Sequence, residues 1–121
     1  MKAWEKRGIE LLEKSLRPVP QELNELDWKL DLSPDKTRLS EHISALANLP
    51  GGGFLVLGIR NTPIPTLEGL SHLDVSKTVG QIANLSRDAL SPVVKTDHAV
   101  ISFDGVPLLF IFIHESSVKP V

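Results

Sequence analysis

The chain has 121 residues, 41% of them hydrophobic and 23% charged, as in a single globular domain with its own core. Its formal net charge of −2 gives no electrostatic signature of nucleic-acid binding, and the absence of cysteine excludes disulfides, thiolate metal sites and thiol nucleophiles. The first residues lack the apolar region of a signal peptide, and the longest apolar run (106–113) is too short to cross a bilayer, so we expect a cytoplasmic protein.

The chain begins with a helical pattern and then changes to an alternating one. A helix is predicted from Lys2 to Leu16, and prolines at 18 and 20 end it because proline cannot donate a backbone hydrogen bond. We therefore expect residues 1–20 to form a leading helix and linker, and residues 21–121 the main domain. Alternation of apolar and polar residues over positions 26–32 predicts a half-buried strand. Its apolar face holds Leu26, Trp28, Leu30 and Leu32, and its polar face holds Asp27, Lys29 and Asp31.

A second helix and a buried strand follow, joined by a glycine turn. Ser33 is the predicted N-cap of this helix and Pro34 its first residue. Its apolar stripe comprises Leu39, Ile43, Leu46 and Ala47. Gly51, Gly52 and Gly53 then form a sharp turn into residues 54–59, whose continuous apolar character predicts a central strand. The next segment, 61–74, is predicted to be a loop with a short extended piece near Leu67.

The last part of the chain reads as one helix and a hairpin. Asp74 is the predicted cap of the helix, Pro92 ends it, and its stripe comprises Val75, Val79, Ile82, Ala83 and Leu90. Two strands, 93–103 and 106–113, flank Asp104-Gly105, a pair typical of a type I′ turn. The expected fold is α+β: a leading helix and then βαβαββ, with helices packed on a mixed sheet. The first two strands are expected to be parallel and the last two antiparallel.

Three motifs in this order resemble the Schlafen AlbA-like domain. They are Leu26-Asp27-Trp28-Lys29-Leu30, the helix end Ile43 to Asn48, and the run Gly51 to Ile59. Gly69-Leu70, Ser91-Pro92 and Phe103-Asp104-Gly105 resemble later landmarks of the family, so the likeness extends from Glu22 to Pro120. It implies a DNA-binding module at the N-terminus of a bacterial or archaeal transcriptional regulator. Because residues 114–121 trail off after the last strand, we expect further domains in the full-length protein.

The resemblance also allows this sequence to be compared with the nuclease members of the family, which hold a divalent cation with three carboxylates. Glu22 and Asp27 match the first two of these positions, but Arg60 and Asn61 stand where the third acid is expected. A hard divalent cation prefers several oxygen ligands. We therefore predict no catalytic residue and no metal; Glu22 and Asp27 are the ligands if a metal is bound. A metal-dependent endoribonuclease is kept as an alternative function.

Basic residues on the same elements favour binding instead. Lys29 and Arg60 lie on or after neighbouring strands and Lys36 and Arg38 open the second helix, so all four are predicted to contact nucleic-acid phosphate. Five acids against Lys29 alone between residues 21 and 35 would repel phosphate unless basic residues from elsewhere line the same surface. The competing interpretation is that Asp27, Lys29 and Arg60 form ion pairs on the sheet.

Other candidate sites carry less chemistry. The turn Gly51–Gly53 could cradle phosphate, as ATP-binding labels in the family suggest, but it runs from helix to strand, so we predict a structural turn and no bound ATP. The histidines at 42, 72, 98 and 114 lack metal-ligand spacing and are expected at the surface or at sheet edges.

The predicted function is thus a non-catalytic, nucleic-acid-binding regulatory module, for DNA rather than RNA, without cofactor or membrane association. We expect a homodimer, because two helices cover only one face of the predicted sheet and a partner could cover the other. The second alternative is a dimerisation or sensing module without affinity for nucleic acid.

Overall fold

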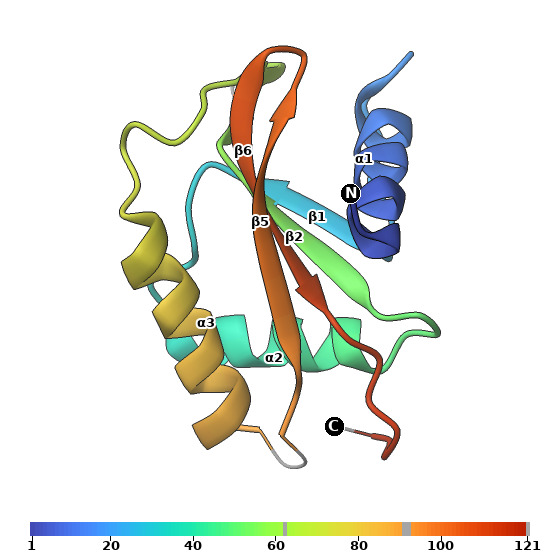
Figure 1. Cartoon of the computed structure of the whole chain (residues 1–121), viewed down its shortest axis with the longest axis vertical. Helices are drawn as coiled ribbons and strands as arrows, with labels where there is room; N and C mark the ends of the chain where they lie inside the picture. Colours follow the sequence, from blue (N-terminus) through green and yellow to red (C-terminus); the bar gives the residue numbers. More distant parts are fainter. Residues whose placement is uncertain (62, 91–92, 121) are drawn as a thin grey trace.

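The computed structural model describes residues 1–61, 63–90 and 93–120 and has the predicted α+β architecture (Figure 1). In chain order the elements are α1 (Ala3–Leu16), β1 (Leu26–Lys29), α2 (Lys36–Ala47), β2 (Gly53–Leu57), β3 (Ile59–Asn61), β4 (Pro65–Leu67), α3 (Val75–Asp88), β5 (Thr96–Phe103) and β6 (Val106–Ile113). The order of a leading helix followed by βαβαββ is confirmed, with the β3–β4 hairpin added where a short extended piece near Leu67 was predicted. Within the described ranges, no helix is long and apolar enough to cross a membrane.

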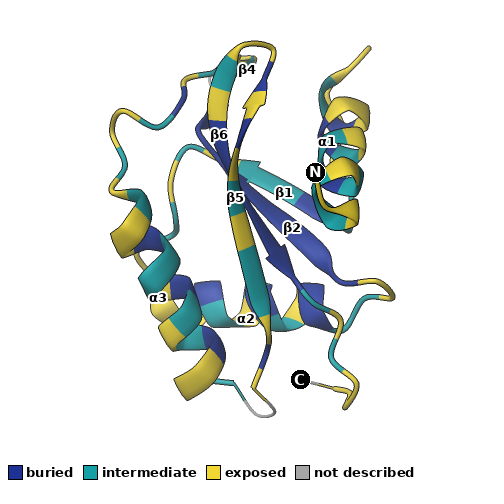
Figure 2. Cartoon of the chain, viewed as in Figure 1, coloured by how far each residue is buried: buried dark blue, intermediate teal, exposed yellow. Residues whose placement is uncertain are grey.

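The main sheet has the strand order β1-β2-β6-β5. As predicted, β1 and β2 are parallel, whereas β6 pairs antiparallel with both β2 and β5. Figure 2 shows the two inner strands, β2 and β6, as the buried centre of the sheet. The outer edges of the sheet are therefore β1 on one side and β5 on the other.

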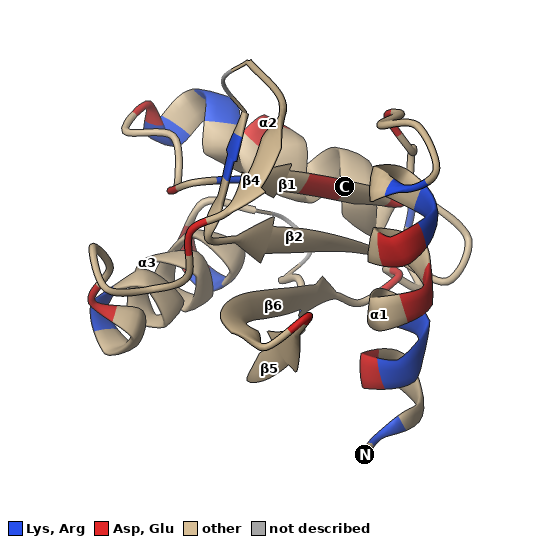
Figure 3. Ribbon diagram, turned by 90° about the horizontal axis from the view of Figure 1, so that it is seen from above, with Lys and Arg blue, Asp and Glu red and all other residues tan. Residues whose placement is uncertain are grey.

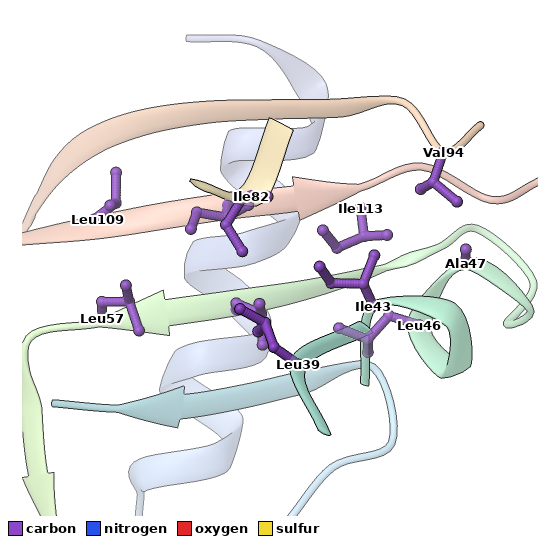
Figure 4. Close-up of a cluster of buried hydrophobic side chains, with 11 residues drawn as sticks. Leu39, Ile43, Leu46, Ala47, Leu57, Ile82, Val94, Leu109 and Ile113 are labelled. Carbon is purple, nitrogen blue, oxygen red and sulfur yellow. The ribbon is translucent and has the colours of Figure 1, made fainter. Parts of the chain in front are cut away.

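Each face of the sheet is covered by helices. On one face, α2 and α3 bury an apolar cluster against β2 and β6, which includes Ile43, Ile82 and Leu109 (Figure 4). On the other face, α1 inserts its fully buried Leu12 among side chains that include Phe54. A partner chain was expected because it could cover this second face, but α1 already packs on it.

The strand predicted over residues 54–59 is divided in two. The chain leaves the sheet at Gly58, which has a φ of 111°, and Ile59 begins β3. A Cβ at Gly58 would lie 2.9 Å from the backbone oxygen of Gly69, and the Gly58 carbonyl accepts hydrogen bonds from the amides of Glu68 and Gly69. The break thus depends on close contact with a segment ten residues away, which apolar patterning does not reveal.

Two boundaries near β1 and α2 also differ from the prediction. The strand ends at Lys29, and Leu32 packs with the cluster under α2 and α3, on the opposite face from Leu26. The N-cap of α2 is Asp35 rather than Ser33, so Pro34 precedes the helix. One Asp35 carboxylate oxygen accepts from two backbone amides, at 3.0 and 3.2 Å, and this double contact explains why the helix starts later.

The second half of the chain follows the prediction more closely. Asp74 caps α3 by accepting from the amide of Lys77 at 3.0 Å. In the turn between β5 and β6, Asp104 and Gly105 both have positive φ, 51° and 79°, as a type I′ hairpin requires. The helix stripe is less apolar than predicted, because Ile82 shares the buried positions of α3 with Thr78 and Ser86. The predicted Ser91-Pro92 landmark lies outside the described residues.

Candidate nucleic-acid interface

A groove of about 710 Å³ runs along the open edge of β1. One wall is segment 20–24, which links α1 to β1, and the opposite wall comes from the first half of α2. Of the residues predicted to contact phosphate, Lys29 and Arg38 line this groove. The predicted metal-site acids Glu22 and Asp27 line it as well. The groove is therefore where the polar face of β1 meets the start of α2.

The polar side chains of β1 interact with one another and with α2. Lys29 Nζ lies 3.5 Å from Asp27 Oδ2, and His42 Nδ1 lies 3.9 Å from the same oxygen. Burial lowers the pKa of His42, an effect that the nearby Asp27 carboxylate opposes and Lys29 reinforces, so the imidazole is uncharged at neutral pH. The groove therefore carries its fixed positive charge on Lys29 and Arg38 rather than on His42.

The start of α2 contributes further positive charge. Lys36 and Arg38 are exposed in its first turn, and within the described ranges neither side chain has a hydrogen bond or ion pair. The first turn of a helix also carries a partial positive charge from its unpaired amides, which favours anions nearby. Figure 3 shows basic segments around the start of α2 and near the end of β1. These two cations are thus available to an anionic ligand.

Arg60 does not join Asp27 and Lys29 in the ion-pair group that the competing interpretation predicts. It lies in β3, where its Nε donates to a Glu68 carboxylate oxygen at 2.6 Å. The pair between Asp27 and Lys29 is present, but Arg60 is not part of it. Arg60 remains half exposed, so its guanidinium reaches solvent beside the end of β1 while already holding one carboxylate.

The two acids of the groove do not fit the three-carboxylate site of the nuclease members. In the described part of the chain, no group of three His, Cys, Asp or Glu residues could hold a metal ion. The third position falls on β3, at Arg60 and Asn61, where Arg60 brings a positive charge. Since a hard cation needs several oxygen ligands, Glu22 and Asp27 alone do not make such a site.

The glycine turn before β2 is held by protein groups. Gly51 and Gly52 have φ values of 78° and 73°. The Gly51 amide donates to the Glu115 carboxylate at 2.9 Å, and the Gly51 carbonyl accepts from Arg7 Nη1 at 2.7 Å. Lys119 and the Gly51 amide together lower the pKa of Glu115, with Lys119 the larger influence. These contacts support the structural interpretation of the turn over a phosphate cradle.

His42 is a member of the groove that the sequence pattern did not indicate. His42 was expected at the surface or at a sheet edge, but it lines the groove together with Arg38. The two residues are four positions apart in α2 and so share one face of the helix. That spacing is the signal that could have brought His42 into the predicted site.

Comparisons with known proteins give a family and a fold. Residues 22–121 match the sequence model of the family described as Schlafen, AlbA_2. The solution structure of the N-terminal domain of a putative ATP-dependent DNA helicase RecG-related protein from Nitrosomonas europaea is similar, with a TM-score of 0.70 and 22% identity over 94% of this chain and 78% of that one. A crystal structure of the DIP2311 protein from Corynebacterium diphtheriae has a TM-score of 0.55 and 20% identity over 98% of this chain and 24% of that one. This chain thus spans about a quarter of the DIP2311 chain. No curated protein matches it.

Proposed function

Because this chain belongs to the Schlafen AlbA_2 family, we propose that it is a non-catalytic module that binds nucleic acid through its phosphates. The observation that carries this proposal is the groove at the edge of β1, with unpaired cations at the adjoining helix start. Lys29, Lys36 and Arg38 are the proposed phosphate contacts, and Arg60 extends them if a phosphate displaces Glu68.

Binding of this kind is salt-sensitive and modest in affinity. Each phosphate neutralised by a cationic side chain releases counterions, so the logarithm of the binding constant falls with the logarithm of salt concentration by about 0.9 per contact. Three contacts give a slope of about −3 for duplex DNA, and the acids of the groove reduce the affinity at all salt concentrations.

The test is a fluorescence-anisotropy titration of labelled DNA and RNA between about 50 and 200 mM salt. The triple variant K29Q/K36Q/R38Q should bind weakly and lose most of the salt dependence. The matched control K77Q/R87Q/K95Q removes the same charge from residues that do not line the groove, and it should keep the wild-type slope. Equal losses in the two variants would mean that net charge alone, and not this surface, attracts the ligand.

Following the family resemblance, we also propose that the module is part of a transcriptional regulator that binds DNA. We take DNA as the first ligand to test, since one structural neighbour is named after a DNA helicase. The module would precede further domains of a cytoplasmic transcriptional regulator. The gene sequence downstream of codon 121 tests this, because a frame without a DNA-binding module would contradict it.

A homodimer remains part of the proposal, at a site other than the face that α1 covers. The outer strand β5 offers eight residues at an open sheet edge, and Val100 at its middle is 52% exposed. Two copies paired antiparallel about Val100 would bring these side chains together on one face. Light scattering on wild type and V100K tests this: a monomeric wild type contradicts the dimer, and an unaltered dimer in V100K contradicts the site.

A further inference from the structure

The acids of the groove have no part in the proposed phosphate binding. Glu22 and Asp27 line the same groove as Lys29 and Arg38, and their negative charges repel phosphate. The carboxylate of Glu22 has no hydrogen bond or ion pair in the described part of the chain. Both contacts of Asp27 use Oδ2, which leaves Oδ1 without a partner there. The groove thus presents unused acceptors as well as cations.

The backbone of the edge strand adds hydrogen-bonding groups to the same groove. The carbonyls of Glu25 and Lys29 accept hydrogen bonds from the amides of Phe54 and Gly58, so the backbone groups of Glu25 and Lys29 point towards β2. Along a strand the direction of the backbone groups alternates, so Leu26 and Trp28 turn their N–H and C=O groups away from β2, towards the groove that they line. The Trp28 side chain is tied to α1, because its Nε1 donates to Ser15 Oγ at 3.1 Å and its ring packs with the cluster that includes Leu12.

Unused carboxylate oxygens in a groove that also holds cations suit a nucleotide base rather than its phosphate. An ionised carboxylate only accepts hydrogen bonds, so its ligand must present donors. Guanine presents two adjacent donors, N1–H and N2–H, on its Watson–Crick edge, and these match the two oxygens of one carboxylate. That edge is accessible only in an unpaired strand, where proteins commonly read it. The groove volume lies within the range of about 300–1,000 Å³ that accommodates compact ligands of this size.

We propose that the groove binds an unpaired guanine, with Glu22 accepting from its N1–H and N2–H groups while Lys29 and Arg38 hold the flanking phosphates. This inference rests on the proposed function and adds the ligand class, single-stranded nucleic acid that contains guanine. Asp27 keeps Lys29 in position through its 3.5 Å contact and offers its second oxygen to the same base. The acids at the positions of the family's metal site thus read a base in this chain.

The test compares short fluorescein-labelled DNA probes that differ at one kind of base. The probes are a single-stranded TTG repeat, the same repeat with inosine in place of guanine, a TTA repeat, and the TTG strand in a duplex. Inosine lacks only the 2-amino group, so it isolates one of the two donors. We expect the TTG strand to bind about tenfold more tightly than the inosine strand, because inosine loses one hydrogen bond to a charged acceptor.

Two variants connect the preference to Glu22. E22Q should bind the TTG strand no better than the inosine strand, because glutamine replaces one acceptor with a donor. E41Q is the matched control, since Glu41 is an exposed acid of α2 that does not line the groove, and it should keep the preference. Thermal unfolding of E22Q should match the wild type, because Glu22 is exposed and makes no hydrogen bond or ion pair with the residues that the structure describes.

The outcomes separate this inference from the proposed function. Equal binding of the TTG, inosine and TTA strands, or a preference that survives in E22Q, overturns guanine recognition and leaves phosphate binding intact. Tighter binding of the duplex overturns the single-strand assignment in the same way. Failure to bind any probe at low salt overturns both proposals.

Discussion

The glycine turn before β2 allows a backbone cost and a steric cost to be measured separately. Gly51 and Gly52 both lie in the left-handed region, with φ of 78° and 73°. A Cβ at Gly51 would lie 3.5 Å from its nearest neighbour, the Arg7 side chain, which is ordinary contact. A Cβ at Gly52 would lie 2.1 Å from the backbone oxygen of Ile113, so β6 or the turn must move.

The expected losses of stability follow from these two environments. A non-glycine residue in the left-handed region costs about 1–2 kcal/mol, so Gly51→Ala should lower the free energy of unfolding by that amount. Gly52→Ala adds overpacking against a backbone that is held in the sheet, which costs about a further 1–3 kcal/mol. Urea unfolding followed by circular dichroism measures both values.

Gly105 supplies the matched control. It has a φ of 79°, and an added Cβ would meet nothing within 4 Å. Gly105→Ala should therefore show the backbone cost alone and agree with Gly51→Ala. If Gly52→Ala were no more destabilising than these two variants, the close approach of the turn to β6 would be refuted.

Three other predictions concern the packing of the helices and the end of β6. Ser15→Ala should lower the free energy of unfolding by about 1–3 kcal/mol, because it removes the buried hydroxyl that accepts from Trp28 Nε1. Gly80→Ala should raise that free energy by about 0.4–1 kcal/mol, since Gly80 lies within α3 and an added Cβ meets nothing within 4 Å. His114→Gln should destabilise the protein at neutral pH but much less in acid. The hydrogen bond from His114 holds the pKa of Asp97 below its usual 3.8, so this stability is present above that value and is lost as pH falls through the folded-state pKa.

Each of these predictions has its own measurement and control. Urea titration of Ser15→Ala is compared with Ser76→Ala, an exposed serine of α3, and equal losses would contradict a role for the buried hydroxyl. For Gly80→Ala the comparison is Gly8→Ala, whose Cβ would lie 3.0 Å from a Phe54 ring carbon, so a stabilising Gly8→Ala would contradict the close docking of α1. For His114→Gln, unfolding is followed from neutral pH to below pH 3.8, and a constant difference from the wild type would contradict the linkage to Asp97.

The sequence predicted the parts of the fold that depend on local chemistry. Asp104-Gly105 specified its hairpin because both residues must adopt positive φ, and Asp74 specified a helix start because its side chain reaches a nearby amide. The predicted start of α2 was wrong because Ser33 and Asp35 are both good N-cap residues. Which of them caps the helix depends on which side chain reaches two backbone amides. The strand break at Gly58 was missed because it requires the backbone of Gly69.

The candidate site shows the same limit. Lys29 and Arg38 could be assigned to one surface because a strand and the helix that follows it meet at the strand's end. The partner of Arg60 could not be predicted, because Glu68 comes within reach only once the β3–β4 hairpin has formed and paired Arg60 with Thr66. The contribution of segment 20–24 to the groove was also hidden, since an irregular linker has no periodicity to reveal which way it faces.

That linker connects the groove to the docking of α1. The Ser15 hydroxyl donates to the Gln21 carbonyl at 2.8 Å, and Gln21 returns a bond from its side chain to the Lys14 carbonyl, so the groove wall is fastened to the end of the helix. If α1 detaches, the wall loses its anchor and the groove loses its shape. Any molecule that binds there therefore raises the free energy needed to release α1. A substitution that loosens α1 weakens binding in proportion to the fraction of molecules in which the helix is released, even when it lies on the far side of the sheet.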